Sequence, residues 1–265
     1  MRFAGTGFLL ATLLASAAMA QPASAVRSDL APSGTLRAGI NYGNFILAAR
    51  DAATGESRGV AIDLTRELAQ RLGVRFELVP YTSVAAMVDA AKTGAWDIAF
   101  LGIDPAREGE IGFSAAYLEI EATYLVPAVS PLRAVAEVDR AGIRVAAPAR
   151  ANYELFLGRS LARAQLVRAP NAEAAFDLLA TGKVDALAGL KQALIGLADR
   201  LPGSRMLDGQ FMKVPQAVGV PRGRDAGLAY LRGFVEDAKA SGLVARAIER
   251  TGARGVSVAS RAAAP

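Results

Sequence analysis

The chain has 265 residues and a formal net charge of +5, and it contains neither cysteine nor histidine. The lack of cysteine excludes disulfides and a lipid anchor, and the lack of histidine removes the commonest general base and metal ligand. The basic residues are scattered, which excludes a nucleic-acid-binding stripe and suits the attraction of small anions. We therefore expect no cofactor, no metal and no nucleic-acid partner.

The N-terminus has the pattern of a secretory signal peptide. Arg2 precedes an apolar run from Phe8 to Ala18, and small residues at cleavage spacing follow in 18–20 and 23–25. The run is shorter than the roughly 20 apolar residues that span a bilayer. We predict a signal peptide over residues 1–25, cleaved after Ala20 or Ala25. The mature protein, about 240 residues long, is large enough for two lobes of about 100 residues each.

From Thr35 onward, short apolar runs alternate with helical periodicity, which predicts strand–helix units and a parallel sheet. Ser83 is typical of a helix N-cap, and Gly94 of a helix end. The first predicted elements are strands at 35–40, 74–79 and 97–101 and helices at 61–72 and 83–93.

A second series of elements follows, bounded by two extended segments at Glu119–Ala128 and Met212–Pro221. Two such crossings imply that the C-terminal helices return to the first lobe. Within and after the second series we expect helices at 153–160, 171–181, 225–240 and 243–251 and a strand at 185–188. The Ala/Ser-rich tail is expected to be disordered.

Two segments match at an offset of 88 residues, pairing Ala86 with Ala174, Asp89 with Asp177, Thr93-Gly94 with Thr181-Gly182, and Asp97 with Asp185. The match indicates either two similar lobes or simply favourable loop chemistry between a helix and a strand. Both interpretations require two strand–helix units. We assign residues 30–120 and 215–252 to lobe 1, residues 125–212 to lobe 2, and residues 253–265 to a disordered tail.

Several short motifs occur in a characteristic order between Gly34 and about Gly252. They are Gly34-Thr35-Leu36-Arg37-Ala38-Gly39, Gly59-Val60-Ala61-Ile62-Asp63-Leu64, Arg71-Leu72-Gly73-Val74, Gly94-Ala95-Trp96-Asp97-Ile98, Asp104-Pro105-Ala106-Arg107 followed by Phe113-Ser114-Ala115-Ala116-Tyr117, Gly182-Lys183-Val184-Asp185-Ala186 and Ala217-Val218-Gly219-Val220. In order and spacing the set resembles the family 3 periplasmic solute-binding proteins of ABC transporters, most of which bind polar amino acids and related solutes.

The resemblance implies an α/β, two-lobed periplasmic-binding-protein fold of type II, with lobes joined by two crossing strands and a ligand in the cleft. It implies a monomeric, non-catalytic receptor that delivers a small carboxylate-bearing, amino-acid-like solute to an ABC transporter permease. Two alternatives stay open because fold does not determine function. One is a periplasmic enzyme on the same scaffold, of the cyclohexadienyl dehydratase type, and the other is a sensory ligand-binding module.

By the resemblance, Arg107 occupies the position at which the family's arginine binds the ligand carboxylate through a bidentate contact. The backbone amides of Leu101 and Gly102 would complement it, because strand ends of α/β folds open into the cleft. Tyr42 and Asn44 follow the first strand, where family members place an aromatic cover over the ligand.

Two further cations are candidates on the opposite lobe, Arg150 in a loop before a helix and Lys191 after a strand. The family's ammonium-binding aspartate corresponds to Leu190, so the ligand lacks an α-ammonium or uses another carboxylate, such as Glu121 or Glu154. The stretch from Asp97 to Arg107 is also shorter than usual and lacks a ligand-binding hydroxyl. We therefore expect the site to favour an acid.

Overall fold

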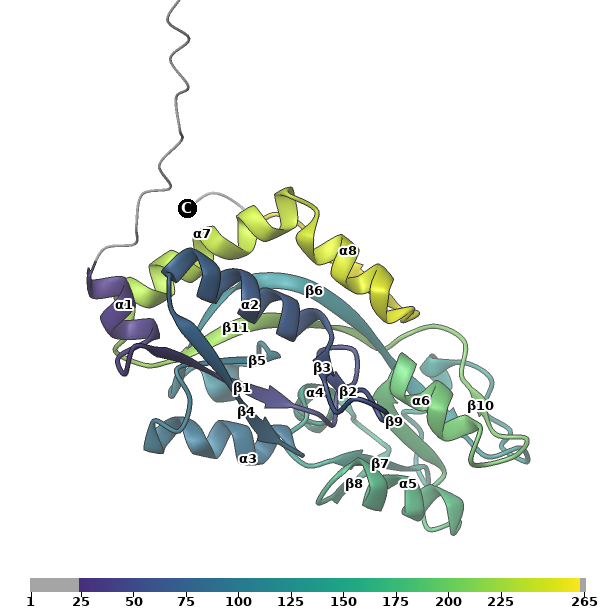
Figure 1. Ribbon diagram of the computed structural model, residues 1–265. Helices are drawn as coiled ribbons and strands as arrows, with labels where there is room; N and C mark the ends of the chain where they lie inside the picture. The colour runs from purple at the N-terminus through teal and green to yellow at the C-terminus, as the bar shows by residue number, and fades with distance from the viewer. Residues whose placement is uncertain (1–23, 263–265) are drawn as a thin grey trace, which may run out of the picture.

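The computed structural model describes residues 24–262, and these form two groups of strands and helices (Figure 1). The predicted signal peptide lies outside the described residues except for its last two positions, which begin helix α1 (Ser24–Leu30). Helix α1 packs on α7 (Asp225–Ala240), where the Asp29 carboxylate accepts a hydrogen bond from Gly227 N at 2.8 Å. No helix within residues 24–262 is long and apolar enough to cross a membrane.

The first unit contains three parallel strands in the order β4-β1-β5. Its elements are β1 (Thr35–Asn41), β4 (Arg75–Tyr81), β5 (Ile98–Gly102), α2 (Val60–Leu72), α3 (Val84–Asp89), the 3₁₀ helix η1 (Ala90–Thr93) and the hairpin β2 (Ala49–Arg50) and β3 (Ser57–Arg58). Ser83 Oγ caps α3 by accepting a hydrogen bond from Ala86 N at 3.2 Å, and Gly94 ends η1 with φ 64°. The predicted cap and stop are confirmed, although the helix tightens to a 3₁₀ turn after Asp89.

The second unit repeats this architecture with parallel strands in the order β9-β7-β8. Its elements are β7 (Arg144–Pro148), β8 (Gln165–Ala169), β9 (Ala186–Leu190), α4 (Asn152–Ser160), α5 (Ala172–Ala180), α6 (Lys191–Ala198), η3 (Val135–Glu137) and β10 (Arg205–Met206). Asn171 Oδ1 caps α5 by accepting from Ala174 N at 2.9 Å, as the sequence predicts.

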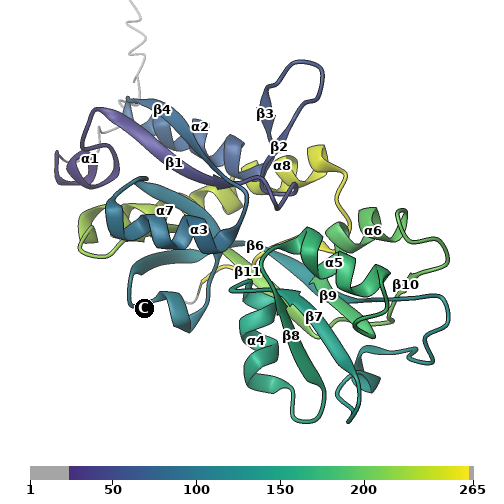
Figure 2. The same cartoon turned by 90° about the horizontal axis from the view of Figure 1, so that it is seen from below.

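Two long antiparallel strands, β6 (Ile111–Val126) and β11 (Met212–Pro221), run between the units (Figure 2). Strand β11 pairs with β5 of the first unit, and β6 pairs with β9 of the second. The hydrogen bonding is therefore continuous from β4 to β8 rather than divided into two separate sheets. Each unit nevertheless buries its own apolar clusters, one pair around Leu64 and Trp96 and another around Leu157 and Phe176.

The same arginine–aspartate pair, with three hydrogen bonds to the carboxylate, holds each unit together at matching positions. Asp97 accepts hydrogen bonds from the backbone N, Nε and Nη2 of Arg37, while Asp185 accepts from the same three atoms of Arg144. In return, Asp97 N donates to Arg37 O, and Asp185 N donates to Arg144 O. The sequence match between Asp97 and Asp185 therefore corresponds to a structural repeat.

The C-terminal helices α7 and α8 (Leu243–Thr251) return to the first unit, as predicted. The expected disorder of residues 253–265 is wrong for the part that the structure describes. Residues Val256–Val258 form strand β12, which pairs with β6 at Leu118–Ile120, and Ala259 is buried. Composition pointed to disorder because small residues have little to bury. The unpaired edge of β6 supplies a backbone ladder that composition does not reveal.

Candidate ligand-binding site

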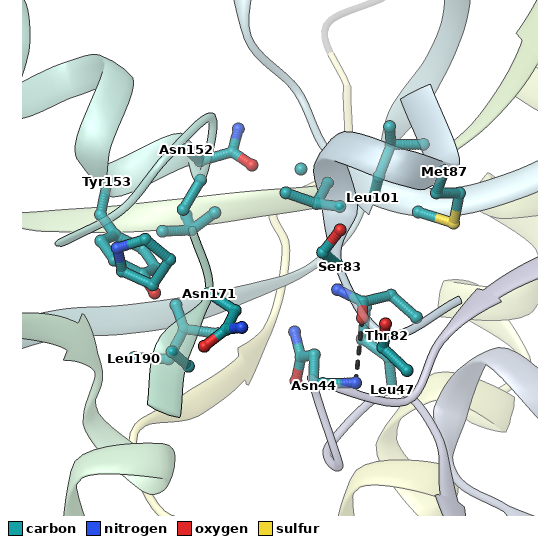
Figure 3. A pocket seen from close by; sticks show the side chains of 18 of the residues that line it. Asn44, Leu47, Thr82, Ser83, Met87, Leu101, Asn152, Tyr153, Asn171 and Leu190 are labelled. Atoms are coloured by element: carbon teal, nitrogen blue, oxygen red, sulfur yellow. Dashed lines mark hydrogen bonds between the residues drawn. The ribbon is translucent and has the colours of Figure 1, made fainter. Parts of the chain in front are cut away.

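A cavity of about 110 Å³ lies between the two units, at the carboxyl ends of their strands and the starts of their helices. Figure 3 shows its labelled side chains in two groups, with Asn152, Tyr153, Asn171 and Leu190 on one side and Asn44, Leu47, Thr82 and Ser83 on the other. Ligands of α/β folds bind at such strand ends because the loops there converge. We take this cavity as the candidate site.

The wall from the first unit is built on a turn after β1. Asn41 Oδ1 accepts a hydrogen bond from Gly43 N at 2.9 Å, and Asn44 N donates to Asn41 O at 3.2 Å. This turn bends the chain so that Asn44 and Leu47 line the cavity. Short asparagine side chains are suited to turns of this kind because they bond to their own backbone.

The wall from the second unit is built on the N-terminal ends of α4 and α5. Asn152 is the first residue of α4, and Asn171 is the N-cap of α5. Free amides at the start of a helix carry partial positive charge, which favours polar or anionic ligand atoms. Tyr153 also lines the cavity, and burial raises the pKa of its phenol, with a smaller contribution from neighbouring Glu154. Tyr153 therefore stays protonated and can donate a hydrogen bond.

Arg107 lies directly behind this wall, at the end of the 3₁₀ helix η2 (Pro105–Arg107), and is 4% exposed. Nη1 donates to Gly102 O at 2.6 Å and to Asn152 Oδ1 at 2.7 Å, and Nη2 donates to Arg150 O at 2.7 Å. Burial lowers the pKa of Arg107 to about 10; Asp104 works against this shift and Arg150 adds to it. Among residues 24–262 no carboxylate forms an ion pair with this guanidinium: its hydrogen bonds go to neutral oxygens, and the charge of Asp104 acts on it without direct contact.

The residues that line the cavity carry no ionisable acid or base other than Tyr153. Their polar groups are amides and hydroxyls, including Asn41, Thr82 and Gln216, and the remainder are apolar side chains such as Met87 and Leu101. Such a surface can orient a polar solute by hydrogen bonds and cover its apolar part. Arg107 does not line the cavity but donates hydrogen bonds to two residues of its wall, Gly102 and Asn152.

The family model for bacterial extracellular solute-binding proteins, family 3, matches residues 36–252 of the chain. The chain belongs to this family. The glutamine-binding protein of Geobacillus stearothermophilus is 26% identical over 191 residues, which cover 70% of this chain and 72% of that protein. This supports the resemblance drawn from the motifs.

Solved structures of similar proteins share the fold. An ancestral amino acid-binding protein described as a precursor of cyclohexadienyl dehydratase has a TM-score of 0.70 at 23% identity, covering 86% of this chain and 99% of that chain. A solute receptor for L-cysteine of Neisseria gonorrhoeae has a TM-score of 0.72 at 21% identity, covering 86% and 93%. The predicted α/β fold, the two-lobed type II architecture of periplasmic binding proteins, is confirmed.

Within this solute-binding protein, the predicted site residues are separated into two groups. Asn44, Leu101 and Gly102 line the cavity, and Arg107 bonds to two lining residues. Tyr42 instead turns away: its hydroxyl shares a hydrogen bond of 2.6 Å with Ser57 Oγ, and Arg50 stacks over its ring at 5.0 Å.

The two candidate cations of the second unit are held in ion pairs outside the cavity. Arg150 Nη1 lies 2.9 Å from Asp89, and Lys191 Nζ lies 2.7 Å from Glu121. Glu121 is therefore engaged, and Glu154 bonds to Arg168 Nε and Arg150 N, both at 2.7 Å. Neither carboxylate lines the cavity, whereas Leu190 does. The structure thus provides no carboxylate at the cavity wall for a ligand ammonium.

Sequence reasoning missed most of the polar wall, namely Asn41, Thr82, Asn152, Tyr153, Asn171 and Gln216. A usable signal existed for two of them. Asn152 and Asn171 each start a helix after a strand of the parallel sheet, and such positions face the carboxyl edge. Gln216 offered no such signal, because it lies within a long strand.

Proposed function

We propose that this protein is the periplasmic receptor of an ABC importer, and that it captures a small amino-acid-like solute whose carboxylate pairs with Arg107. The observation that carries the proposal is the environment of Arg107, which is buried and donates its hydrogen bonds to neutral oxygens. A buried guanidinium without a directly bonded anion among residues 24–262 is costly, and a ligand carboxylate would supply that bond. A related glutamine-binding protein and a structurally similar receptor for L-cysteine support an amino-acid-like solute.

We also propose the lobe division that transport requires, with residues 30–120 and 215–252 in one lobe and 125–212 in the other. Separate apolar clusters in the two units and the two connecting strands β6 and β11 support it. Closure would be favoured by a solute because only the closed state lets both lobes contact it. Release to a permease would then follow from reopening.

A receptor role agrees better with the cavity than a dehydratase does. An acid–base reaction needs groups whose pKa values suit proton transfer. The described cavity wall offers amides, hydroxyls and a phenol whose pKa is raised by burial. These groups can bind and orient a solute, and for this reason we place binding first.

The test is a thermal-shift screen of amino acids, dicarboxylates and aromatic keto acids, followed by calorimetry with the best binder. A solute that binds only the folded state raises the melting temperature by mass action. Arg107→Ala should fold but lose roughly 2–5 kcal/mol of binding free energy, the usual cost of removing one partner of a buried charged pair. Arg163→Ala, at an exposed arginine, is the matched control. Parental affinity in Arg107→Ala, or a best binder without a carboxylate, would refute the assignment.

A further inference from the structure

We propose that the side chain of Asn152 takes the place of the solute carboxylate. In the solute-free protein it accepts a hydrogen bond from Arg107 and thereby ties the two lobes together. This inference rests on the proposed function, because it takes Arg107 as the carboxylate site. It adds a competitor, carried by the protein itself, for the same guanidinium.

Both polar ends of the Asn152 side chain are bonded across the cleft. Oδ1 accepts from Arg107 Nη1 at 2.7 Å, and Nδ2 donates to Ile103 O at 2.7 Å. A carboxamide has the planar shape of a carboxylate and offers Arg107 an acceptor oxygen without the charge. Because bonds between two ionised groups are stronger than bonds to a neutral acceptor, a solute carboxylate can displace it.

The backbone around Asn152 is shaped for this contact. Arg150 has φ 62° and is the one non-glycine residue within 24–262 with a positive φ. Its N donates to Glu154 Oε2, and its O accepts from Arg107 Nη2, both at 2.7 Å. Left-handed backbone is uncommon for arginine, and such conformations persist where the surroundings enforce them, often at functional sites. Here it presents the Arg150 carbonyl and the Asn152 amide to one guanidinium.

The opposite wall has space for the amide because residue 102 is glycine. A Cβ at position 102 would overlap the Oδ1, Cγ and Nδ2 atoms of Asn152. Position 102 has no positive φ that would itself demand glycine. Glycine at position 102 therefore serves to let the Asn152 amide approach the backbone closely.

The consequence is a closed solute-free state. Two ion pairs join the same two lobes near the amide: the exposed pair of Arg150 with Asp89, and the part-buried pair of Arg159 with Asp104. A solute must displace Asn152 before it reaches Arg107. Since the apparent affinity scales with the fraction of competent sites, the amide lowers the apparent affinity of every solute carboxylate that uses Arg107 by the same factor.

The chain's lack of cysteine allows a direct test with two introduced labels. Spin labels on cysteines at the exposed positions Gln70 of lobe 1 and Ala162 of lobe 2 report the separation of the lobes by pulsed EPR. The solute-free protein is measured in high salt, which weakens the exposed pair of Arg150 with Asp89. We expect Asn152→Ala and Gly102→Ala both to shift the distribution to longer distances, and Asn152→Asp to keep the parental distance.

Gly109→Ala is the matched control, because a Cβ at this position of the same loop meets nothing within 4 Å. It should leave the distance unchanged. Parental distances in both Asn152→Ala and Gly102→Ala would overturn the proposal, even if Arg107→Ala abolishes solute binding. Conversely, longer distances in both variants with no binder in the solute screen would uphold the tie between the lobes and reject the proposed function.

Discussion

Asp97 is a fully buried carboxylate that accepts hydrogen bonds from the backbone and side chain of Arg37, and from Arg224 Nη1 at 3.1 Å. It joins β1, β5 and the loop before α7. Asp97→Asn keeps the shape but removes the charge, and its NH₂ group would face guanidinium donors. Breaking a buried pair in this way costs roughly 3–5 kcal/mol. At about 2–4 °C per kcal/mol for a protein of this size, the melting temperature should fall by roughly 6–20 °C.

Asp185→Asn is the internal control for this prediction. Asp185 makes the same three contacts with Arg144, but the two side chains are 35% and 40% exposed. Water screens the exposed pair and can replace its lost partners, so the fall in melting temperature should be much smaller. Thermal unfolding of both variants by circular dichroism at neutral pH is the measurement. An equal or larger loss in Asp185→Asn would refute the reasoning that burial decides the cost.

Two further predictions concern pH and the C-terminus. Hydrogen bonds from Arg144 lower the pKa of Asp185, so the stabilisation is present above the unfolded pKa of about 3.9 and lost as the pH falls through the lower folded pKa. The melting-temperature gap between the parent and Asp185→Asn should be constant above about pH 5 and shrink below about pH 4; a gap that widens in acid would contradict this. Deleting residues 253–265 removes β12, its ladder with β6 and the 2.8 Å bond from Lys239 Nζ to Ser260 O. We expect a lower melting temperature and faster hydrogen exchange in β6 near Ile120, and unchanged exchange there would show that β12 adds no protection.

Local rules were sufficient wherever a short stretch of chain determines its own conformation. Ser83 and Asn171 cap their helices through bonds to backbone amides three residues away, and Gly94 takes the left-handed conformation that ends a helix. The repeated Thr-Gly-x-x-Asp pattern likewise placed Asp97 and Asp185 at equivalent positions. The order of such elements was enough to predict the fold class, whereas the position of Arg107 was inferred from the family resemblance.

Which charged side chains are available to a ligand, in contrast, depends on contacts between residues far apart in the chain. Arg150 pairs with Asp89, 61 positions away, and Lys191 pairs with Glu121, 70 positions away. Periodicity and composition carry no information about such pairs, so both cations seemed available to a ligand. The amide of Asn152, which occupies Arg107 from 45 positions away, was hidden for the same reason. The sequence by itself determined which groups could form the site, and only the packing of the two lobes decided which of them face the cavity.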